Sequence, residues 1–172
     1  MSIVLPRILR AFDLYVGDNN YAGTCEKIKL PKNSPKLEEL NAGGLSRPLK
    51  VAVGYDADWE MSFSTKGLDF DLLVNSNCSV DGVPIMILGS LGEGDSCIER
   101  AFKAYFWGQI QEADAGDLSL NELSTNDVTL AVARVQYFVD GKEIYFEDPM
   151  NMIRRINGKD QLAERRRHLG RQ

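Results

Sequence analysis

The sequence predicts a mainly β domain with a few short helices. Two observations carry this prediction. Apolar and polar residues alternate with a period of two over long stretches, and Asp-Gly pairs lie between segments rich in β-forming residues. A chain of 172 residues is long enough for one well-filled core and too short for two ordinary domains. We therefore expect a single domain over residues 1–172.

Three stretches show the strand pattern. Residues 20–30 alternate weakly, and residues 128–139 are apolar on both faces, which predicts a strand buried on both sides. Residues 51–63 alternate most clearly, and a strand of this length is often bent or shared between two sheets. One face of it should be wet and mostly acidic. The opposite face should be buried and consists of Val51, Val53, Tyr55, Ala57, Trp59, Met61 and Phe63.

A tight hairpin is predicted at residues 135–148, where two β-rich runs flank Asp140 and Gly141. The same pair recurs at Asp81 and Gly82. The glycine-rich stretch 88–96 lacks the lysine of a phosphate-binding loop and is interpreted as a hairpin loop. Residues 97–111 fit helical spacing and strand alternation about equally well.

Helices are expected in three places. Residues 67–76 have room for about two turns, with Leu68, Leu72 and Leu73 facing inward. Residues 34–44 have a capping residue, Ser34, followed by a proline at the first helical position. Residues 159–170 follow an Asn-Gly turn, carry basic residues in the last turns and close on Gly170.

Charge is distributed unevenly along the chain. The formal net charge is −5, yet residues 154–172 contain seven basic and two acidic residues and so carry +5. The remainder therefore carries −10. An acidic body repels phosphate, which argues against a nucleic-acid-binding protein.

The cysteines predict a reducing compartment, and the apolar runs are too short for a signal peptide or a membrane span. Cys25, Cys78 and Cys97 are odd in number and form no CxxC pair, which favours free thiols over disulfides or a zinc site. The first residues are interrupted by Pro6 and Arg7, so they do not form a signal peptide, and no stretch approaches the length of a membrane span. We expect a soluble cytoplasmic product.

Signals of catalysis are nearly absent. The single histidine, His168, lies in the predicted C-terminal helix and offers no sheltered base for nucleophilic catalysis. Asp56, Asp58 and Glu60 on one strand face could contribute to a calcium site, but a solvated face is favoured. The aromatic residues 105–107 resemble base-stacking residues, but core packing is favoured over nucleic-acid binding. No catalytic, metal or cofactor site is expected.

The basic C-terminal end has two interpretations. The arginines at 165–167 could form an arm that contacts phosphates. However, they lie in a predicted helix with Leu162 and Leu169, and their charge is opposite to that of the body. In a self-assembling protein such ends attract head to tail, which gives rings or filaments. We favour docking to another copy.

Residues 140–170 resemble the end of the major tail tube proteins of contractile phage tails, the P2-like family that includes R-type pyocin tubes. The hairpin, the break at Asp148 and Pro149, and the motifs "NMI" and "INGKDQLAxxRxxLG" occur in the family's order. Upstream, "DNNYAGTCEKIKLPK", "NAGGL", "FSTKG" and "EADAGD" also resemble it, so that the similarity spans nearly the whole chain.

This resemblance implies two packed antiparallel sheets with a short flanking helix and a short C-terminal helix, and it favours a strand at 97–111. It also implies hexameric rings that stack into a hollow tube inside a contractile sheath. The tube would enclose a tape-measure protein and, transiently, DNA without sequence-specific binding. The subunit would bind no membrane and would be located in the virion after assembly in the bacterial cytoplasm.

The resemblance further implies that the N-terminal segment, residues 31–48 and residues 152–172 reach other subunits. An acidic lumen would let DNA pass, and we assign Asp56, Asp58 and Glu60 to it. The candidate subunit contacts are Leu30, Pro31, Lys32, Gly43, Gly44, Ile156, Asn157, Gln161, Leu162, Arg165, Arg166 and Leu169.

Two other functions compete with a tube subunit. A stand-alone β-barrel module could bind an apolar ligand among Tyr55, Trp59, Phe102 and Phe106. A hydrolase or metal enzyme is disfavoured because the chain has one histidine.

Overall fold

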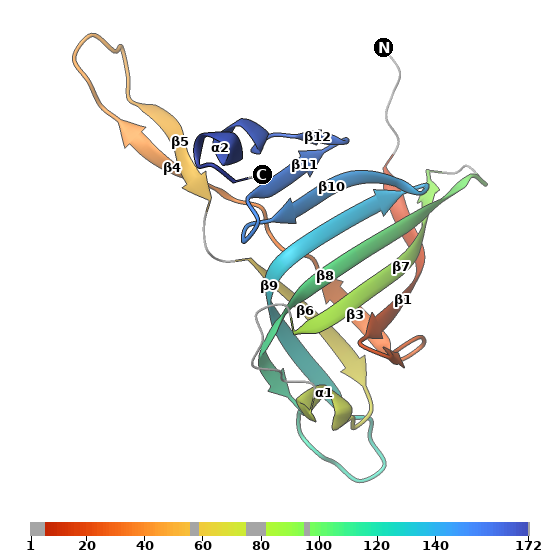
Figure 1. Cartoon of the computed structure of the whole chain (residues 1–172). Helices are drawn as coiled ribbons and strands as arrows, with labels where there is room; N and C mark the ends of the chain where they lie inside the picture. The colour runs from red at the N-terminus through yellow and green to blue at the C-terminus, as the bar shows by residue number, and fades with distance from the viewer. Residues whose placement is uncertain (1–5, 56–58, 75–81, 95–96, 172) are drawn as a thin grey trace.

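Long antiparallel strands dominate the structure. The computed structural model describes residues 6–55, 59–74, 82–94 and 97–171 (Figure 1). The strands are β1 (Arg7–Val16), β2 (Asn19–Asn20), β3 (Cys25–Lys29), β4 (Pro35–Leu40), β5 (Leu49–Tyr55), β6 (Glu60–Lys66), β7 (Val83–Glu93), β8 (Glu99–Asp114), β9 (Thr125–Val139), β10 (Lys142–Asp148), β11 (Ile153–Ile156) and β12 (Lys159–Asp160), and the helices are α1 (Asp71–Val74) and α2 (Ala163–His168).

These strands form two antiparallel sheets, as the resemblance to the tail tube family implies. In the described ranges, ten strands make one sheet in the order β12-β11-β10-β9-β8-β7-β1-β2, from which β6 and then β3 branch at β9. The other sheet is the β4–β5 pair, hereafter called the ribbon. The branch exists because the first half of β9 pairs with β6 and its second half pairs with β10, while β8 pairs along both halves.

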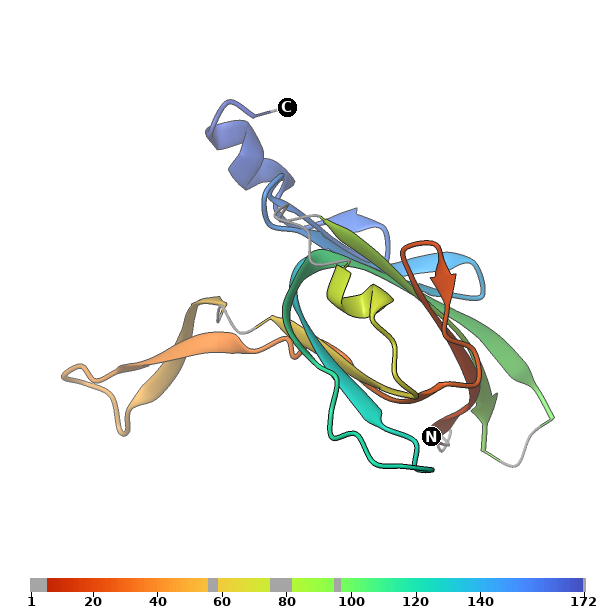
Figure 2. The same ribbon diagram turned by 90° about the horizontal axis from the view of Figure 1, so that it is seen from below.

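A glycine allows β8 and β9 to bend at this branch. The pairing of β8 with β9 shifts register between Trp107 and Gly108. A Cβ atom at Gly108 would collide with the backbone carbonyl oxygen of Ala131. The absence of a side chain therefore permits the close approach of the two strands. Bending carries β6 and β3 around to face β1 and β7, as seen in Figure 2.

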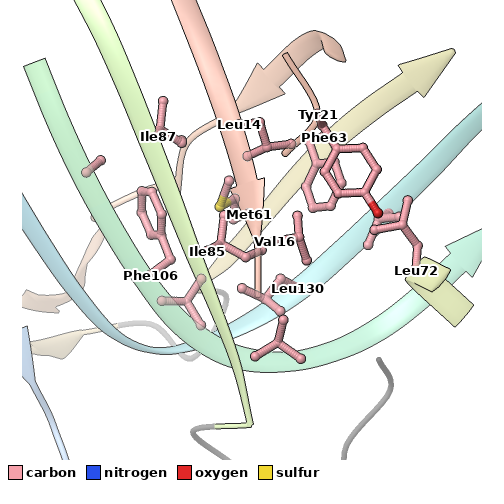
Figure 3. Close-up of a cluster of buried hydrophobic side chains, with 14 of the residues drawn as sticks. Leu14, Val16, Tyr21, Met61, Phe63, Leu72, Ile85, Ile87, Phe106 and Leu130 are labelled. Carbon is pink, nitrogen blue, oxygen red and sulfur yellow. The ribbon is translucent and has the colours of Figure 1, made fainter. Parts of the chain in front are cut away.

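The core fills the space enclosed by this curled sheet. Side chains from β1, β6, β7, β8 and β9 point inward together, and Leu72 of α1 and Tyr21 contribute from one end (Figure 3). The labelled members are Leu14, Val16, Tyr21, Met61, Phe63, Leu72, Ile85, Ile87, Phe106 and Leu130, all of which are buried. This is the single core expected for the chain length.

The predicted hairpin and the ambiguous stretch are both resolved as strands. Lys142 pairs with Val139 across a two-residue turn, in which Asp140 and Gly141 both have positive φ angles, 51° and 76°. A turn of this kind matches the twist of the flanking strands. Residues 97–111 lie almost entirely in β8. The second Asp-Gly pair includes Asp81, which lies outside the described residues.

Three predictions about local structure are wrong. Residues 34–44 do not form a helix, because residues 35–40 pair with β5 as strand β4. Most of the glycine-rich stretch 88–96 is not a loop, since residues 88–93 continue β7 in register with β1 and β8. In these segments, long-range strand pairing outweighs the local capping and turn preferences. The helix expected over 67–76 does not begin before Asp71: α1 covers residues 71–74, with Leu72 buried and Leu68 exposed, while residues 75–76 and the side chain of Leu73 lie outside the description.

Two predictions about burial are also wrong. The alternating stretch 51–63 is shared between two sheets, and of its described residues only Met61 and Phe63 are fully buried, while Ala57 lies outside the described residues. The row Val51, Val53 and Tyr55 is about half exposed, because among the described residues no other strand or helix covers this face of the ribbon beyond its root. Strand β9 is not buried on both sides, since Ala131 and several neighbours on its outer face are accessible.

Candidate assembly interfaces

The ribbon projects from the main body and is exposed along its whole length (Figure 1). Leu40 pairs with Leu49, and alternation places Val51 on the same face, where these side chains are 50%, 48% and 45% exposed. Burying one such half-exposed side chain stabilises by about 1 kcal/mol. An isolated two-stranded ribbon is at best marginally stable in water. The apolar face is therefore suited to contact with another protein surface.

The root of the ribbon is clamped to β10 and β11 at both of its strands. Before β4, Asn33 Nδ2 donates a hydrogen bond to the hydroxyl of Tyr145 at 3.2 Å, and that hydroxyl donates to Glu147. At the end of β5, the Tyr55 ring lies 4.1 Å from the guanidinium carbon of Arg154.

Arg154 connects these contacts. It is 8% exposed, pairs across the strands with Glu147 and lies 3.9 Å from that carboxylate. Burial lowers its pKa, but the hydrogen bond with Tyr55 and the charge of Glu147 outweigh this and raise it. Burial, together with the neighbouring Glu147, also raises the pKa of the Tyr145 hydroxyl. The cation therefore stays charged and holds the ribbon root against the sheet.

The C-terminal block, residues 152–171, folds back on β10 through β11, β12 and α2. Asp160 organises it, because its carboxylate accepts hydrogen bonds from the Leu162 and Arg154 backbone N–H groups. It also forms an ion pair with Arg166 at 2.6 Å, and Arg166 donates to the backbone carbonyl of Met152. Burial alone would raise the pKa of Asp160, but these bonds lower it overall. As predicted, α2 ends just before Gly170 and carries basic residues in its last turn. The predicted start at residue 159 is wrong, because Lys159 and Asp160 pair with β11 as strand β12 and the helix begins at Ala163.

The predicted contact residues fall on the ribbon and the C-terminal block, and the structure brings the two regions together. A cavity of about 460 Å³, hereafter the root cavity, lies between them. Lys32 lines it from the ribbon side and Leu162 from the C-terminal side. Of the other candidates, Leu30, Gly43, Gly44, Asn157, Gln161, Arg165 and Leu169 are exposed, while Pro31, Ile156 and Arg166 are partly buried.

The predicted lumen residues are placed only in part. Asp56 and Asp58 lie outside the described residues. Glu60 is exposed at the start of β6. Along the same sheet, Lys27 and Lys29 of β3 share a surface hollow with Asp127. This part of the surface therefore carries both signs of charge.

The alternative sites do not assemble as sequence patterns suggested. Tyr55 and Trp59 line the root cavity, whereas Phe106 is fully buried in the core and Phe102 packs against it. His168 is exposed on α2. Within the described ranges, no three His, Cys, Asp or Glu residues are grouped to hold a metal ion. No helix in these ranges is long and apolar enough to cross a membrane.

Aromatic residues 105–107 split between the two faces of β8. Phe106 is in the core, as predicted. On the other face, Tyr105 stacks on Trp107 and meets Phe138 edge to face, and Arg134 lies 4.2 Å from the centre of the Trp107 ring. These contacts occupy the rings within the chain.

Sequence reasoning missed the clamp. From the sequence, Arg154 is one of several arginines in the basic end. It pairs with Glu147, and its neighbour in β11, Arg155, makes a similar but more exposed pair with Glu143. The alternation of β11 opposite β10 could have indicated that Arg154 and Arg155 face opposite sides. Nothing local indicates that Asn33 meets Tyr145, which is 112 residues away.

Comparisons with known proteins agree with this architecture. The chain is 28% identical over 171 residues to the tail tube protein of Escherichia phage P2, covering 98% of this chain and 99% of that protein. It is 24% identical over 164 residues to the major tail tube protein of Serratia phage KSP20, with 95% of each chain covered.

Solved structures share the fold. A sheath/tube terminator of an extracellular contractile injection system, PVC, superposes with a TM-score of 0.57 at 16% identity, covering 80% of this chain and 99% of that one. The sheath-tube complex of the same system gives 0.53 at 15% identity over 74% and 88%. The family model for phage tail tube protein FII matches residues 6–170. The chain therefore belongs to the phage tail tube protein FII family.

Proposed function

We propose that this chain is the repeating subunit of a contractile tail tube, in which copies form hexameric rings that stack inside a sheath. The tube then conveys DNA, or serves to puncture a membrane in a headless particle. Tail tube proteins are structural, so the subunit is not an enzyme. It is a component of the tail, and we infer that it assembles in the bacterial cytoplasm.

The exposed apolar face of the ribbon carries this proposal. Val51, Val53 and Leu49 are each about half exposed in the isolated chain. Covering these side chains together with Leu40 would contribute several kcal/mol for every contact, and every copy repeats the contact. Open strand edges at β3 and β12 would also be protected inside a closed ring.

Relatives supply the expected partners. The PVC structures combine a tube with a sheath, and the analogous outer partner here is a sheath protein. A tape-measure protein and DNA would occupy the lumen in turn. A lumen of net negative charge would avoid binding the phosphates, and this is the role we propose for Asp56, Asp58 and Glu60. No membrane binding by the subunit is proposed.

Electron microscopy of the purified protein tests assembly directly. Negative-stain images across a concentration series should show six-fold rings and rods, and sedimentation velocity should show the loss of monomer. Val51→Asp with Val53→Asp should leave folded monomers that form no rods, because charge is then placed on the apolar face. Ala52→Asp, on the opposite face of β5, should still assemble. Wild-type protein that stays monomeric at every concentration, with or without a tail initiator, would refute the proposal.

Lysine substitution tests the lumen assignment separately. Replacing Asp56, Asp58 and Glu60 by lysine should leave tubes intact but reduce DNA transfer in a complemented phage, because each lysine can bind a phosphate. Undiminished transfer with intact tubes would show that these residues do not face the path of the DNA.

A further inference from the structure

The loop between β8 and β9, residues 115–124, exposes three leucines within six positions. Leu118, Leu120 and Leu123 are 70%, 94% and 75% exposed. Backbone contacts hold the loop at its base, because Gly116 N–H donates to the Asp114 carboxylate and Gly67 N–H donates to the Ser124 carbonyl. A cluster of nearly bare leucines on an anchored loop marks a contact surface.

The same end of the molecule is acidic. From residue 104 to residue 133 the chain has no lysine or arginine but has five acidic residues, Glu112, Asp114, Asp117, Glu122 and Asp127. The net charge of this segment, −5, is equal and opposite to that of residues 154–172. Figures 1 and 2 both place the loop and α2 at opposite ends of the body. The subunit is therefore an electrical dipole with an apolar tip on its negative end.

The opposite end offers two adjoining hollows that share the turn at residues 149–153. One is the root cavity, whose lining combines apolar side chains such as Trp59, Met152 and Leu162 with one cation, Lys32, and one carboxylate, Glu147, that is paired with Arg154. The second has a volume of about 420 Å³ and is lined by Arg166 and Arg171 together with Met150, Asn151 and Ile153. An apolar hollow beside a basic one complements leucines flanked by Asp117 and Glu122.

We infer that the leucine loop of one copy docks in the root cavity of the next copy, with its acidic residues facing Arg171 beside the Arg166–Asp160 ion pair. The loop cannot reach the cavity of its own chain, because the two lie at opposite ends. Two different surfaces thus meet in a heterologous contact, which generates a closed ring or an open stack rather than an isolated dimer. This inference rests on the proposed tube and names one contact within it.

Disulfide trapping tests the contact. The two variants Leu120→Cys and Met152→Cys are prepared separately, each in a background with the three native cysteines replaced by serine. Each is assembled alone and also as an equal mixture of the two, and all samples are mildly oxidised. Covalent dimers should form in the mixture but in neither protein alone. A chain with both substitutions should give a ladder of covalent multimers. Dimers from Leu120→Cys alone would indicate a symmetric contact and overturn the inference. Leu120→Cys mixed with Ile98→Cys, another exposed apolar position, is the control and should not cross-link.

A second variant removes the apolar tip without altering the core. Leu118, Leu120 and Leu123 changed together to serine should leave the unfolding temperature unchanged and raise the concentration needed for rods by about tenfold or more. Ile98→Ser should assemble as wild type. This inference is refuted if the triple variant forms rods normally, or if the mixture of cysteine variants forms rods without cross-links. In either case the proposed tube would still be supported. Wild-type protein that forms no rods at any concentration would overturn both.

Discussion

Replacing Arg154 by methionine should loosen the ribbon and destabilise the subunit. Methionine keeps much of the apolar stem and removes the charge that joins Glu147 to the Tyr55 ring. Loss of the cation–π contact with a partly exposed ring costs about 1 kcal/mol. Leaving the Glu147 carboxylate, 16% exposed, without its cation costs about a further 1–2 kcal/mol.

The two effects together predict a loss of about 2–3 kcal/mol, which corresponds to a melting temperature lower by about 4–12 °C in a domain of this size. Urea unfolding followed by circular dichroism measures the loss as a shift of the midpoint. Spin labels at Gly43→Cys and Lys142→Cys, in a background with the native cysteines replaced, report the orientation of the ribbon. The distance distribution between them should broaden in Arg154→Met.

Arg155→Met is the matched control. Arg155 is the next residue of β11, forms an ion pair with Glu143 at 2.8 Å and lies 4.2 Å from the Phe146 ring. Its side chain is 34% exposed, compared with 9% for Arg154, and its partners Glu143 and Phe146 both belong to β10, not to the ribbon. It should cost about 1 kcal/mol and leave the ribbon distances unchanged. Equal broadening in both variants, or a cost below about 0.5 kcal/mol for Arg154→Met, would refute the clamp.

Three further predictions concern the body and the C-terminal block. Gly108→Ala should destabilise the subunit by about 3 kcal/mol or more in urea unfolding, because the new Cβ collides with the Ala131 carbonyl; wild-type stability would contradict the bend. Acid should weaken the C-terminal block: the Arg155 hydrogen bond lowers the pKa of Glu143, and the bonds around Asp160 lower its pKa despite burial. The stability that these carboxylates contribute is present above their unfolded-state pKa values near 4 and is lost as pH falls below them. If Asp160→Asn has the same dependence of unfolding free energy on pH as wild type, this prediction is contradicted. Truncation after Gly158 should leave a folded subunit, since α2 contains no buried residue, but should abolish rods in electron micrographs; full-length tubes would exclude a docking role.

Local chemistry accounts for the elements that were predicted correctly. Asp140 and Gly141 specify a tight turn by themselves, whatever the rest of the chain does. The Asn-Gly turn at 157–158 similarly specifies the tight connection between β11 and β12, and Gly170 follows the end of the C-terminal helix. The prediction for residues 34–44 is wrong because Ser34 and Pro35 are compatible with a helix start. The strand that pairs with this segment, β5, begins only at Leu49, so a local pattern does not reveal it.

The candidate interfaces were predictable in outline only. The resemblance and the charge pattern pointed to the ribbon region and the C-terminal end. However, the meeting of these regions at Arg154, and the root cavity beside it, depend on contacts between residues about a hundred positions apart. Leucines are common in buried segments, so the sequence alone does not indicate that those of the β8–β9 loop are exposed.

By itself the sequence determined the hairpin at Asp140 and Gly141 and how charge is divided between the two ends, because these properties depend on near neighbours. Tertiary structure alone decided which apolar rows are covered. Val53 and Phe63 belong to the same alternating stretch, yet Phe63 is 2% exposed and Val53 is 53% exposed. The reason is that burial requires a facing surface: the curled sheet provides one for β6, whereas β5 must find its own outside the chain.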